Sequence, residues 1–510
     1  MANYIMMMGT SSHVGKSILA TAMCRILYRK GRKVVPFKAQ NMALNSYVTR
    51  EGDEMGRAQV AQAEAAGMEP MVDMNPVLLK PTGNAASQVI IMGKPVGNMS
   101  AREYHRGYSL KAFDAVKEAL GRLDKEYDTI VIEGAGSPAE INLKANDIVN
   151  MRVAKYLQAP VLLIADIDRG GALASLVGTL DLLDEEERAL VKGLVINKFR
   201  GDVTLLTPAI DFLEKKTGKP VLGVVPHIEQ MGIDDEDSVS LEEKQAAPRE
   251  GDIRIAVIQT PKISNFTDFD ALAHEKDVAL YYVKSVEDLG EPDIIMLPGS
   301  KNTTEDMLYL RKSGLGEKIL AHVQAGKAVI GICGGYQMLG EVIRDPQHTE
   351  SQNDEVAGLG LLGMETVFAS EKLTSQVVAQ CQDLQFMGQS ISADNLQGYE
   401  IHMGHTAFTR EADNHPFTVC QRRGKACASQ EGTANAAGNV FGTYIHGVFD
   451  NDVFRRSVLN AIRHSKGLEA LANTRNVMAE KQQAYEHLAD VVENALDMEK
   501  LYQIMGEKTC

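Results

Sequence analysis

Two short stretches of the sequence carry residue types that could do chemistry. The first, GTSSHVGKS, follows an apolar run and precedes a helical pattern. A helix N-terminus offers unpaired backbone N–H groups and a partial positive charge, so it can hold phosphate. Lys16 could reach the β- and γ-phosphates of a nucleotide, and the Ser17 hydroxyl could bind Mg²⁺. Gly9 and Gly15 would let the backbone wrap closely around the anion. The stretch therefore predicts a nucleotide site, although Thr10 stands where the usual phosphate loop has its first glycine.

The second stretch is VIGICGGYQMLG, in which Cys333 directly follows an apolar run and precedes two glycines. A sharp strand-to-helix turn of this kind exposes one side chain, and the helix N-terminus after it favours a reactive thiolate. The N–H of Gly334 and the backbone around Gly299, in the loop LPGSKNT, could form an oxyanion hole. His446, in GTYIHGVF, is the best candidate for the base, with a buried structural role as the alternative. The pattern predicts nucleophilic catalysis by a Cys–His pair.

The elements that position these residues follow from an alternation of β-rich apolar runs with helical patterns, which is typical of parallel sheets covered on both faces. The first series of predicted strands covers residues 4–8, 33–37, 129–136, 160–167, 192–199 and 220–226. The second series covers residues 253–261, 278–284, 293–300, 328–340 and 441–450. We therefore predict an α/β protein of two doubly wound domains. The predicted parts are a domain over 1–232, a linker over 233–251, a domain over 252–450, and a helical segment over 451–510 packed on the second domain.

The composition excludes several classes of protein. A chain of 510 residues with 44% hydrophobic and 24% charged residues fits two or three globular domains. The formal net charge of −15 argues against a general nucleic-acid surface. The 6 cysteines contain no C-x-x-C pair and fit neither a disulfide framework nor a zinc site, so a cytoplasmic location is expected. No apolar run is long enough to cross a membrane, and we expect neither membrane insertion nor secretion.

Polar residues at other strand ends near the phosphate loop are candidates for ligand binding, because ligands of open α/β sheets collect at this edge. Lys38 could contact phosphate or an anionic substrate, and Arg169 could pair with a carboxylate. Neutral amides next to them suit a large ligand that carries both carboxylates and amides. The candidate substrate-binding residues are Lys38, Gln40, Asn41, Asn45, Asp166 and Arg169, with Asp168 beside them. Each also has a purely structural alternative, such as a helix-face lysine or a capped loop.

The displaced glycine of the first stretch resembles the phosphate loop of the dethiobiotin synthetase-like ATPases, which are related to the MinD and partition ATPases. That resemblance implies a P-loop NTPase-like fold and a Mg²⁺ site completed by two acids. The matching acids are Asp53 in EGDEMGRAQ and Glu133 in EGAGSPAE. An exposed loop acid and a turn acid are their structural alternatives. The resemblance also implies that Asn197 and Lys198 read the adenine.

The second stretch resembles the class I, or triad, glutamine amidotransferases. There the cysteine attacks the carboxamide of glutamine, forms a thioester and releases ammonia. The common pattern has a glutamate two residues after the histidine, whereas this chain has Val448. A Cys–His pair without that acid is what the cobyric acid and cobyrinate diamide synthase branch shows. Glu400 is a weak candidate for the group that orients His446.

An ATPase joined to a glutaminase is an apparatus for making an amide from an acid. Nearly the whole chain resembles the cobyric acid synthase family, through motifs such as PFKAQNMALNS, ADIDRGGALASLVGT, LVINKFRGD and PKISNFTDFDAL. The resemblance implies ATP- and glutamine-dependent amidation of the b, d, e and g carboxylates of (adenosyl)cobyrinic acid a,c-diamide, which gives cobyric acid in cobalamin biosynthesis. It implies Mg²⁺ with ATP and no bound prosthetic group, since the corrinoid is the substrate.

Three alternatives stay open from the sequence. One is the sister enzyme cobyrinic acid a,c-diamide synthase, and another is an ATP-dependent amidotransferase for a different small molecule. The most remote is a partition-type regulatory ATPase carrying an inactive amidotransferase domain. An intact Cys333 and His446 argue against the last of these. The sequence does not define the oligomeric state, so an oligomer is possible.

Overall fold

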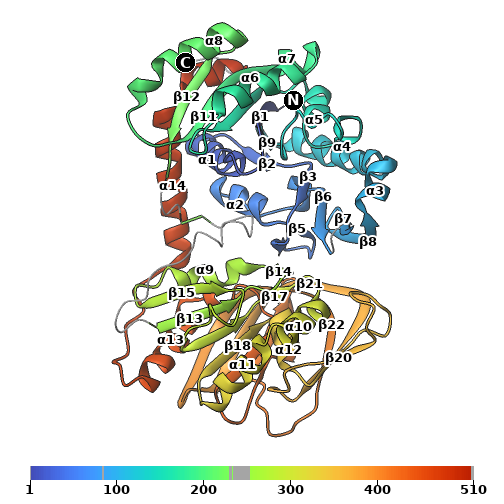
Figure 1. Cartoon of the computed structure of the whole chain (residues 1–510), viewed down its shortest axis with the longest axis vertical. Coiled ribbons are helices and arrows are strands. Elements are labelled where there is room, and N and C mark those ends of the chain that lie inside the picture. The colour runs from blue at the N-terminus through green and yellow to red at the C-terminus, as the bar shows by residue number, and fades with distance from the viewer. Residues whose placement is uncertain (1, 83–85, 229–231, 234–252, 507–510) are drawn as a thin grey trace.

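The computed structural model describes residues 2–82, 86–228, 232–233 and 253–506, which form two α/β domains stacked along the long axis of the molecule (Figure 1). The predicted linker over 233–251 lies outside the described residues apart from Ile233. The first domain contains a parallel sheet of six strands in the order β12-β11-β10-β1-β9-β2. Its strands are β1 (Asn3–Gly9), β2 (Val34–Phe37), β9 (Thr129–Glu133), β10 (Val161–Asp166), β11 (Val191–Phe199) and β12 (Val221–Pro226). All six predicted strands of this domain are confirmed.

Helices cover both faces of this sheet because its strands are apolar on both sides. On one face lies α1 (Lys16–Arg29), whose buried side chains form a core with side chains of β1 and β10 that point to the same face. The other face packs against α4 (Ser109–Glu126), α5 (Met151–Leu157), α6 (Ala172–Leu182) and α8 (Thr207–Thr217). The remaining helices of the domain are α2 (Arg57–Ala65), α3 (Ala101–Glu103) and α7 (Glu185–Leu190). This arrangement confirms a doubly wound fold.

A smaller group of strands extends the first domain toward the second (Figure 1). One sheet has the order β3-β6-β7-β8, and a second pairs β4 with β5. The strands are β3 (Gln40–Met42), β4 (Ser46–Val48), β5 (Glu54–Gly56), β6 (Val77–Pro81), β7 (Ala86–Ile91) and β8 (Lys94–Ser100). The sequence analysis did not predict these strands, which are short or lie at the edge of the domain.

The second domain has a sheet in the order β15-β13-β16-β18-β26-β25, parallel except for its last strand. Its strands are β13 (Ile253–Ile258), β15 (Val278–Val283), β16 (Ile294–Leu297), β18 (Ala328–Ile332), β25 (Thr433–Ala434) and β26 (Val440–Thr443). The helices around it are α9 (Asp270–Ala273), α10 (Thr303–Lys312), α11 (Leu315–Gln324) and α12 (Gly334–Leu339). A short antiparallel pair, β14 (Ile263–Ser264) and β17 (Gly299–Ser300), brings two loops together at the carboxyl edge. The predicted α/β fold is confirmed here as well.

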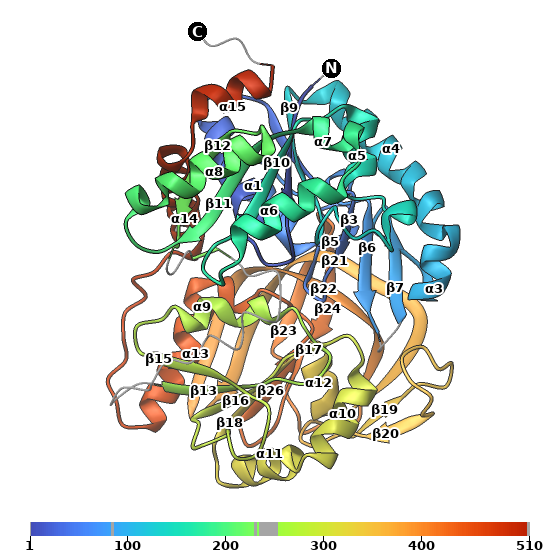
Figure 2. The ribbon, with the colours of Figure 1, turned by 45° about the horizontal axis from the view of Figure 1, so that its top comes forward.

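The second domain also contains a mainly antiparallel sheet that the sequence analysis did not predict. Its strands are β19 (Val342–Arg344), β20 (Glu355–Ala357), β21 (Met364–Phe386), β22 (Gln389–Phe408), β23 (Phe417–Arg422) and β24 (Lys425–Glu431). The long hairpin of β21 and β22 reaches the first domain, where both strands contact β4 (Figure 2). Thr374 on β21 donates a hydrogen bond to the Gly52 carbonyl at 2.7 Å, so this hairpin is part of the domain contact.

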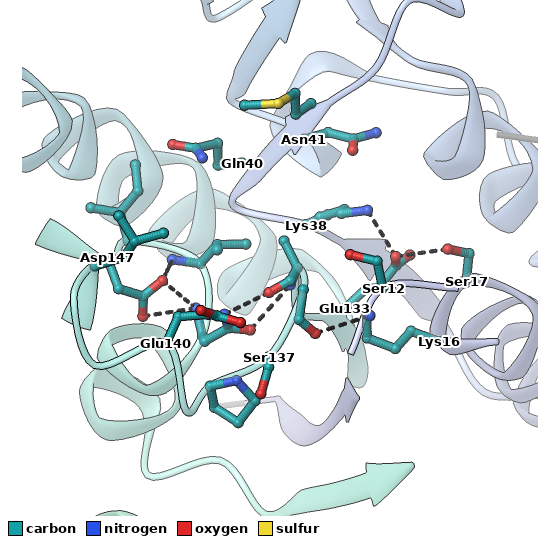
Figure 3. A pocket seen from close by; sticks show the side chains of 18 of the residues that line it. Ser12, Lys16, Ser17, Lys38, Gln40, Asn41, Glu133, Ser137, Glu140 and Asp147 are labelled. Atoms are coloured by element: carbon teal, nitrogen blue, oxygen red, sulfur yellow. Dashed lines mark hydrogen bonds and ion pairs between the residues drawn. The ribbon is translucent and has the colours of Figure 1, made fainter. Parts of the chain in front are cut away.

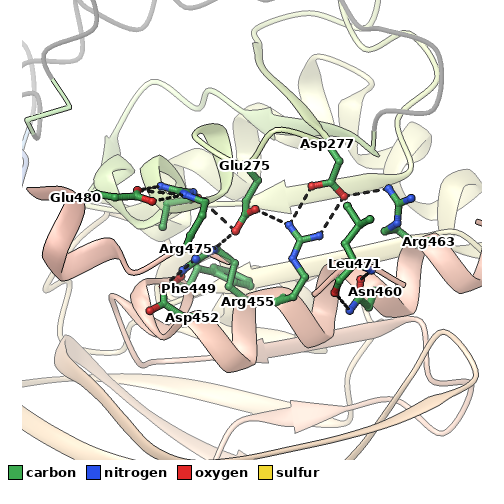
Figure 4. A network of polar contacts seen from close by, with 12 residues as sticks. Glu275, Asp277, Phe449, Asp452, Arg455, Asn460, Arg463, Leu471, Arg475 and Glu480 are labelled. Atoms are coloured by element: carbon green, nitrogen blue, oxygen red, sulfur yellow. Dashed lines mark hydrogen bonds and ion pairs between the residues drawn. The ribbon is translucent and has the colours of Figure 1, made fainter. Parts of the chain in front are cut away.

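The C-terminal segment begins with α13 (Asp452–Ser465), which packs on the second domain as predicted. Its apolar side chains enter the core of that domain. Its arginines face two acids near β15 (Figure 4). Arg455 donates to Glu275 at 2.7 Å, and Arg456 donates to Asp277 at 2.9 Å. Arg455 is fully buried, so these ion pairs compensate for the loss of water around its charge.

The rest of that segment corrects our prediction, because it packs on the first domain. Helix α14 (Val477–Ala495) buries Tyr485, Leu488 and Val492 in the core beside α1. This spacing places one apolar stripe on a helix, but the stripe alone does not say which domain it covers. An ion pair between Arg25 of α1 and Glu486, at 2.7 Å, accompanies this apolar contact. The last helix, α15 (Met498–Ile504), joins the same core. The chain thus returns to the domain in which it began.

Candidate active sites

The phosphate loop has the geometry expected for an anion site. Gly15 adopts φ 96°, a left-handed conformation, and a Cβ there would lie 2.2 Å from Asn197 Nδ2. The displaced glycine has a packing reason too, since a Cβ at Gly9 would lie 2.5 Å from Val14 Cγ2. Thr10 continues the strand, because its N–H donates to the Ile164 carbonyl at 2.9 Å. The loop therefore requires glycine at positions 9 and 15, not at 10.

Lys16 and Ser17 lie at the opening turn of α1, facing the end of β9. The Lys16 ammonium donates to the carbonyls of Ser11 and Gly136, at 2.8 and 3.1 Å. The Ser17 hydroxyl donates to Glu133 at 2.8 Å (Figure 3). The predicted phosphate-binding lysine and the predicted Mg²⁺-binding hydroxyl are thus brought together.

Glu133 is the centre of a buried polar cluster at the carboxyl end of β9. Its carboxylate is fully buried and accepts hydrogen bonds from Lys38 at 2.8 Å and Gln62 at 2.6 Å, besides Ser17. A buried carboxylate needs such partners, because burial strips its charge of water. The carboxylate next to a hydroxyl is an oxygen donor set that suits Mg²⁺. The residues present therefore fit the ion that ATP carries.

Asp53 is not brought to this cluster. Its carboxylate pairs with Lys94 of β8 at 2.7 Å, and Asp53 does not line the cavity that contains Ser17 and Glu133. The reason is local: Asp53 lies in the turn between β4 and β5, which extends toward the second domain. The predicted second acid of the Mg²⁺ site therefore needs correction. Gln59 and Gln62 of α2 occupy the side of Glu133 where an acid was expected.

A cavity of about 1230 Å³ opens from the phosphate loop toward α4 and α5. Of the predicted ligand-binding residues it contains Gly15, Lys16, Ser17, Lys38, Gln40, Asn41, Glu133, Arg169 and Lys198. Large apolar side chains along its wall stay exposed, namely Met42, Leu143 and Tyr156. Exposed apolar surface inside a concave site is typical of ligand binding. Its volume of about 1230 Å³ exceeds the roughly 300–1,000 Å³ of ordinary small-molecule pockets.

Two predicted ligand residues brace the phosphate loop through contacts with its backbone. The Asn197 side chain donates to the Val14 carbonyl at 2.8 Å, and the Lys198 ammonium donates to the His13 carbonyl at 2.7 Å. Asp166 pairs with Lys198 at 2.9 Å and does not line the cavity. Asp166 is thus placed as a support of the loop, not as a substrate ligand.

Asn45 is also placed away from the cavity. Its side chain accepts the N–H of Phe266 at 3.2 Å, and the N–H of its neighbour Ser46 donates to Asn265 at 3.0 Å. These reciprocal contacts join the two domains. Asp168, in turn, pairs with Arg200 at 3.1 Å on the surface. The predicted substrate-binding role of Asn45 is therefore replaced by a role in the domain contact.

The second site lies at the carboxyl end of β18, where Cys333 makes the tight turn that the sequence predicts. Cys333 has φ 51° and ψ −108°, a strained conformation for a residue other than glycine. The turn needs glycines after it, because a Cβ at Gly335 would lie 2.0 Å from the Leu297 carbonyl oxygen. A Cβ at Gly334 would lie 2.7 Å from the Ser300 nitrogen. The loop of Gly299 and Ser300 therefore lies directly against the turn, where the oxyanion hole is expected.

His446 is fully buried and lines the same pocket as Cys333, whose charge acts on its ring. On the other side of the ring, Nδ1 contacts Asp268 Oδ2 at 2.7 Å. The second oxygen of Asp268 accepts the N–H of Gly447 at 2.8 Å. Asp268 thus holds both the imidazole and the backbone that carries it. The order Cys–His–Asp is the geometry of a catalytic triad.

Asp268 is the functional residue that the sequence analysis missed. It lies 178 positions before His446, in the motif PKISNFTDFDAL, so spacing gives no signal for the pair. Glu400, the weak candidate, instead forms an ion pair with Arg422 at 2.8 Å. The missing acid of the usual pattern is therefore supplied by another loop of the same domain.

Electrostatics favour a charged imidazole in this triad. Burial disfavours imidazolium, but the negative charges of Asp268 and Cys333 outweigh it and raise the pKa of His446 to about 10. His402 also lines the pocket over Cys333, yet burial lowers its pKa to about 4. His402 is therefore neutral at pH 7, and His446 is the histidine that can hold and pass a proton.

Comparisons with known proteins match both domains. Residues 5–239 match the family model described as the CobQ/CobB/MinD/ParA nucleotide binding domain. Residues 254–454 match the CobB/CobQ-like glutamine amidotransferase domain. The chain is 53% identical to a cobyric acid synthase from Moorella thermoacetica, over 99% of this chain and 98% of that protein. The chain belongs to the cobyric acid synthase family. It is therefore a glutamine-dependent, ATP-using amide ligase.

Other members of the family are similarly close. A cobyric acid synthase from Pelotomaculum thermopropionicum is 52% identical over 99% of this chain and 97% of that protein. One from Carboxydothermus hydrogenoformans is 50% identical over 99% of this chain and 100% of that protein. The two domains that the family joins are thus both present here, in the same order. Among the described residues, no helix has the length and hydropathy needed to span a bilayer.

Proposed function

We propose that this enzyme amidates the b, d, e and g carboxylates of (adenosyl)cobyrinic acid a,c-diamide, using ATP and glutamine, and so makes cobyric acid in the cytoplasm. The observation that carries the proposal is the presence, in one chain, of a Cys–His–Asp site and a phosphate-loop cavity of about 1230 Å³. The names of the relatives support the choice of acceptor. A cavity with both basic and apolar walls suits a large ring that carries carboxylates.

In the glutaminase half, the Cys333 thiolate attacks the carboxamide carbon of glutamine. The N–H groups of Gly334 and of the loop at Gly299 stabilise the oxyanion. His446, held by Asp268, donates a proton to the leaving nitrogen, so that ammonia departs and a thioester forms. Water, activated by the same imidazole, then hydrolyses the thioester to glutamate.

In the ATPase half, a carboxylate of the acceptor attacks the γ-phosphorus of ATP and gives an acyl phosphate and ADP. Lys16 and the N-terminus of α1 stabilise the charge on the transferred group. Ser17 and Glu133 would hold the Mg²⁺ carried with ATP, which neutralises phosphate charge. Ammonia then attacks the acyl carbon, and phosphate leaves. Each amide therefore consumes one ATP and one glutamine.

The test is mass spectrometry of cobyrinic acid a,c-diamide after incubation with the protein, ATP, Mg²⁺ and glutamine. Each exchange of OH for NH₂ lowers the mass by about one dalton, so four successive steps are expected. Cobyrinic acid, the acceptor of the alternative a,c-diamide reaction, is tested in a separate reaction under the same conditions. Two steps on cobyrinic acid with none on its diamide would instead assign the chain to the a,c-diamide reaction. No mass change on either acceptor, with glutamine still hydrolysed, would move the activity to another acid.

A further inference from the structure

The pocket over Cys333 has a charged end that the mechanism above does not use. Lys301 and Glu350 line it from the loops after β17 and β19, and Lys372 lines it from β21. Lys80 reaches it from β6 of the first domain. Glutamine that places its carboxamide at Cys333 must extend its α-carbon toward some other part of this pocket. The lysines and the glutamate at this charged end have charges opposite to those of the α-carboxylate and the α-ammonium group of glutamine.

Two of these lysines already have a partner. Lys80 donates to Glu54 at 2.8 Å, and Lys372 contacts the other oxygen of the same carboxylate. Glu54 is fully buried, so it depends on both ammonium groups. Lys80, Glu54 and Lys372 therefore form a closed cluster across the domain contact.

Lys301 and Glu350 keep capacity for a ligand. Within the described part of the chain, the Lys301 ammonium makes no hydrogen bond or ion pair, and it borders the pocket. Glu350 accepts one hydrogen bond at Oε2, from the Thr303 N–H at 2.8 Å. Lys80 and Lys372 share the carboxylate of Glu54, whereas the acid whose charge acts most on Lys301 is Glu350. A ligand carboxylate would give the Lys301 ammonium a direct partner.

We propose that Lys301 binds the α-carboxylate of glutamine and Glu350 binds its α-ammonium group, which makes this pair the determinant of amino-acid specificity. The inference rests on the proposed glutaminase activity. The loop LPGSKNT would then serve twice, since Gly299 lies at the oxyanion and Lys301 follows two residues later. Binding both charged groups of the substrate fixes the distance from the α-carbon to Cys333 and aligns the carboxamide for attack.

The electrostatics of the ligand-free pocket agree with this assignment. Burial lowers the pKa of the Lys301 ammonium and raises the pKa of Glu350 to about 7. The charge of the other group only partly offsets this burial for each of them. A bound amino acid supplies a carboxylate to one and an ammonium to the other. Other small amides that lack these charges would leave the two groups with only each other's charge.

The first experiment uses the unmodified protein and two analogues of glutamine. In L-glutamine α-N-methylamide an uncharged amide replaces the α-carboxylate, and glutaramate lacks the α-ammonium group. We expect kcat/KM for hydrolysis to fall about tenfold to hundredfold with each analogue, the range for losing one hydrogen bond between charged groups. Equal hydrolysis of glutamine and both analogues would overturn the proposal. Since this comparison needs no variant, it does not depend on the folding of a mutant.

The second experiment pairs each analogue with a variant. Lys301→Met should lower kcat/KM for glutamine about as much as the N-methylamide does in the unmodified protein, with little further loss when the two are combined. Glu350→Gln should behave in the same way with glutaramate. Amide synthesis from added ammonia should be unchanged in both variants. Lys312→Met, on the exposed end of α10, is the matched control and should hydrolyse glutamine normally.

The outcomes separate this inference from the function beneath it. Full glutamine hydrolysis by Lys301→Met, or additive losses from variant and analogue, would remove Lys301 from the subsite. If the unmodified protein released no ammonia from glutamine, the proposed function itself would fail. If it hydrolysed glutamine but did not discriminate against the analogues, only the subsite assignment would be wrong.

Discussion

Replacement of Asp268 by asparagine tests the triad directly. The change keeps the size of the side chain but removes the negative charge that holds His446 Nδ1 at 2.7 Å. The pKa of His446 rises from its ordinary 6.5 to about 10 in the fold. That difference corresponds to roughly 5 kcal/mol at 1.36 kcal/mol per pKa unit. Burial opposes this rise, and the charge of Asp268 is the largest of the causes that produce it, so losing this carboxylate should lower kcat for glutamine hydrolysis by roughly a hundredfold or more.

The assay is ammonia release from glutamine as a function of pH. The active pair is thiolate and imidazolium, so activity is lost as pH rises through the pKa of His446. In the unmodified protein this loss should occur near pH 10, and in Asp268→Asn it should begin at lower pH. Glu400→Gln, which alters the ion pair with Arg422, should leave that limb in place. An Asp268→Asn variant with normal kcat and an unmoved basic limb would refute the assignment of Asp268.

Three further changes test the division of labour between the sites. Cys333→Ala should abolish glutamine-dependent synthesis but leave synthesis from ammonia at high pH; equal loss of both would contradict the separation of the two sites. Lys16→Ala should stop amide formation from either nitrogen source, and undiminished synthesis would exclude this loop as the ATP site. Glu54→Gln leaves two ammonium groups buried without their carboxylate. The free energy of unfolding, measured from the first transition in a denaturant titration, should therefore fall by about 3–5 kcal/mol. Although burial alone would raise it, the pKa of Glu54 is lowered by Lys372 and Lys80. The contribution of Glu54 to stability is therefore present above pH 4.5 and is lost as the pH falls further. If the variant were as stable as the unmodified protein at pH 7, Glu54 would not be stabilising the domain contact.

Much of the framework could be predicted because local patterns decide it. Apolar runs with turn residues at their ends predicted every parallel strand of the two main sheets but not the antiparallel edge strand β25, and the carboxyl edges of those sheets contain Glu133 and Cys333. Gly-Lys-Ser before a helix and a cysteine before two glycines are constraints within a few residues. For this reason Lys16, Ser17 and Cys333 lie where the sequence places them.

The failures share a physical cause, which is that pairing across long separations has no local pattern. Asp268 lies after β14 and meets His446, which follows β26, across a separation of 178 positions. Asp53 looked like a helix-flanking acid, yet its turn extends away from the cavity and pairs with Lys94. The stripe on α14 predicted a buried face but could not name the domain that buries it.

The contact between the domains has a chemical purpose as well as a structural one. Ammonia is protonated in bulk water at neutral pH and is then no nucleophile, so it must pass between the sites without mixing with solvent. Val48 and Tyr47 of the first domain pack on Tyr399 and Ile401 of the second, as a small apolar cluster. Tyr399 stacks on the His446 ring at 5.0 Å between centroids. This cluster lies directly beside the imidazole of the triad, and Lys80 of the first domain lines the pocket that contains Cys333. The first domain therefore supplies part of the wall of the Cys333 pocket, and α14, which follows α13 on the second domain, connects the two domains a second time by packing on the first.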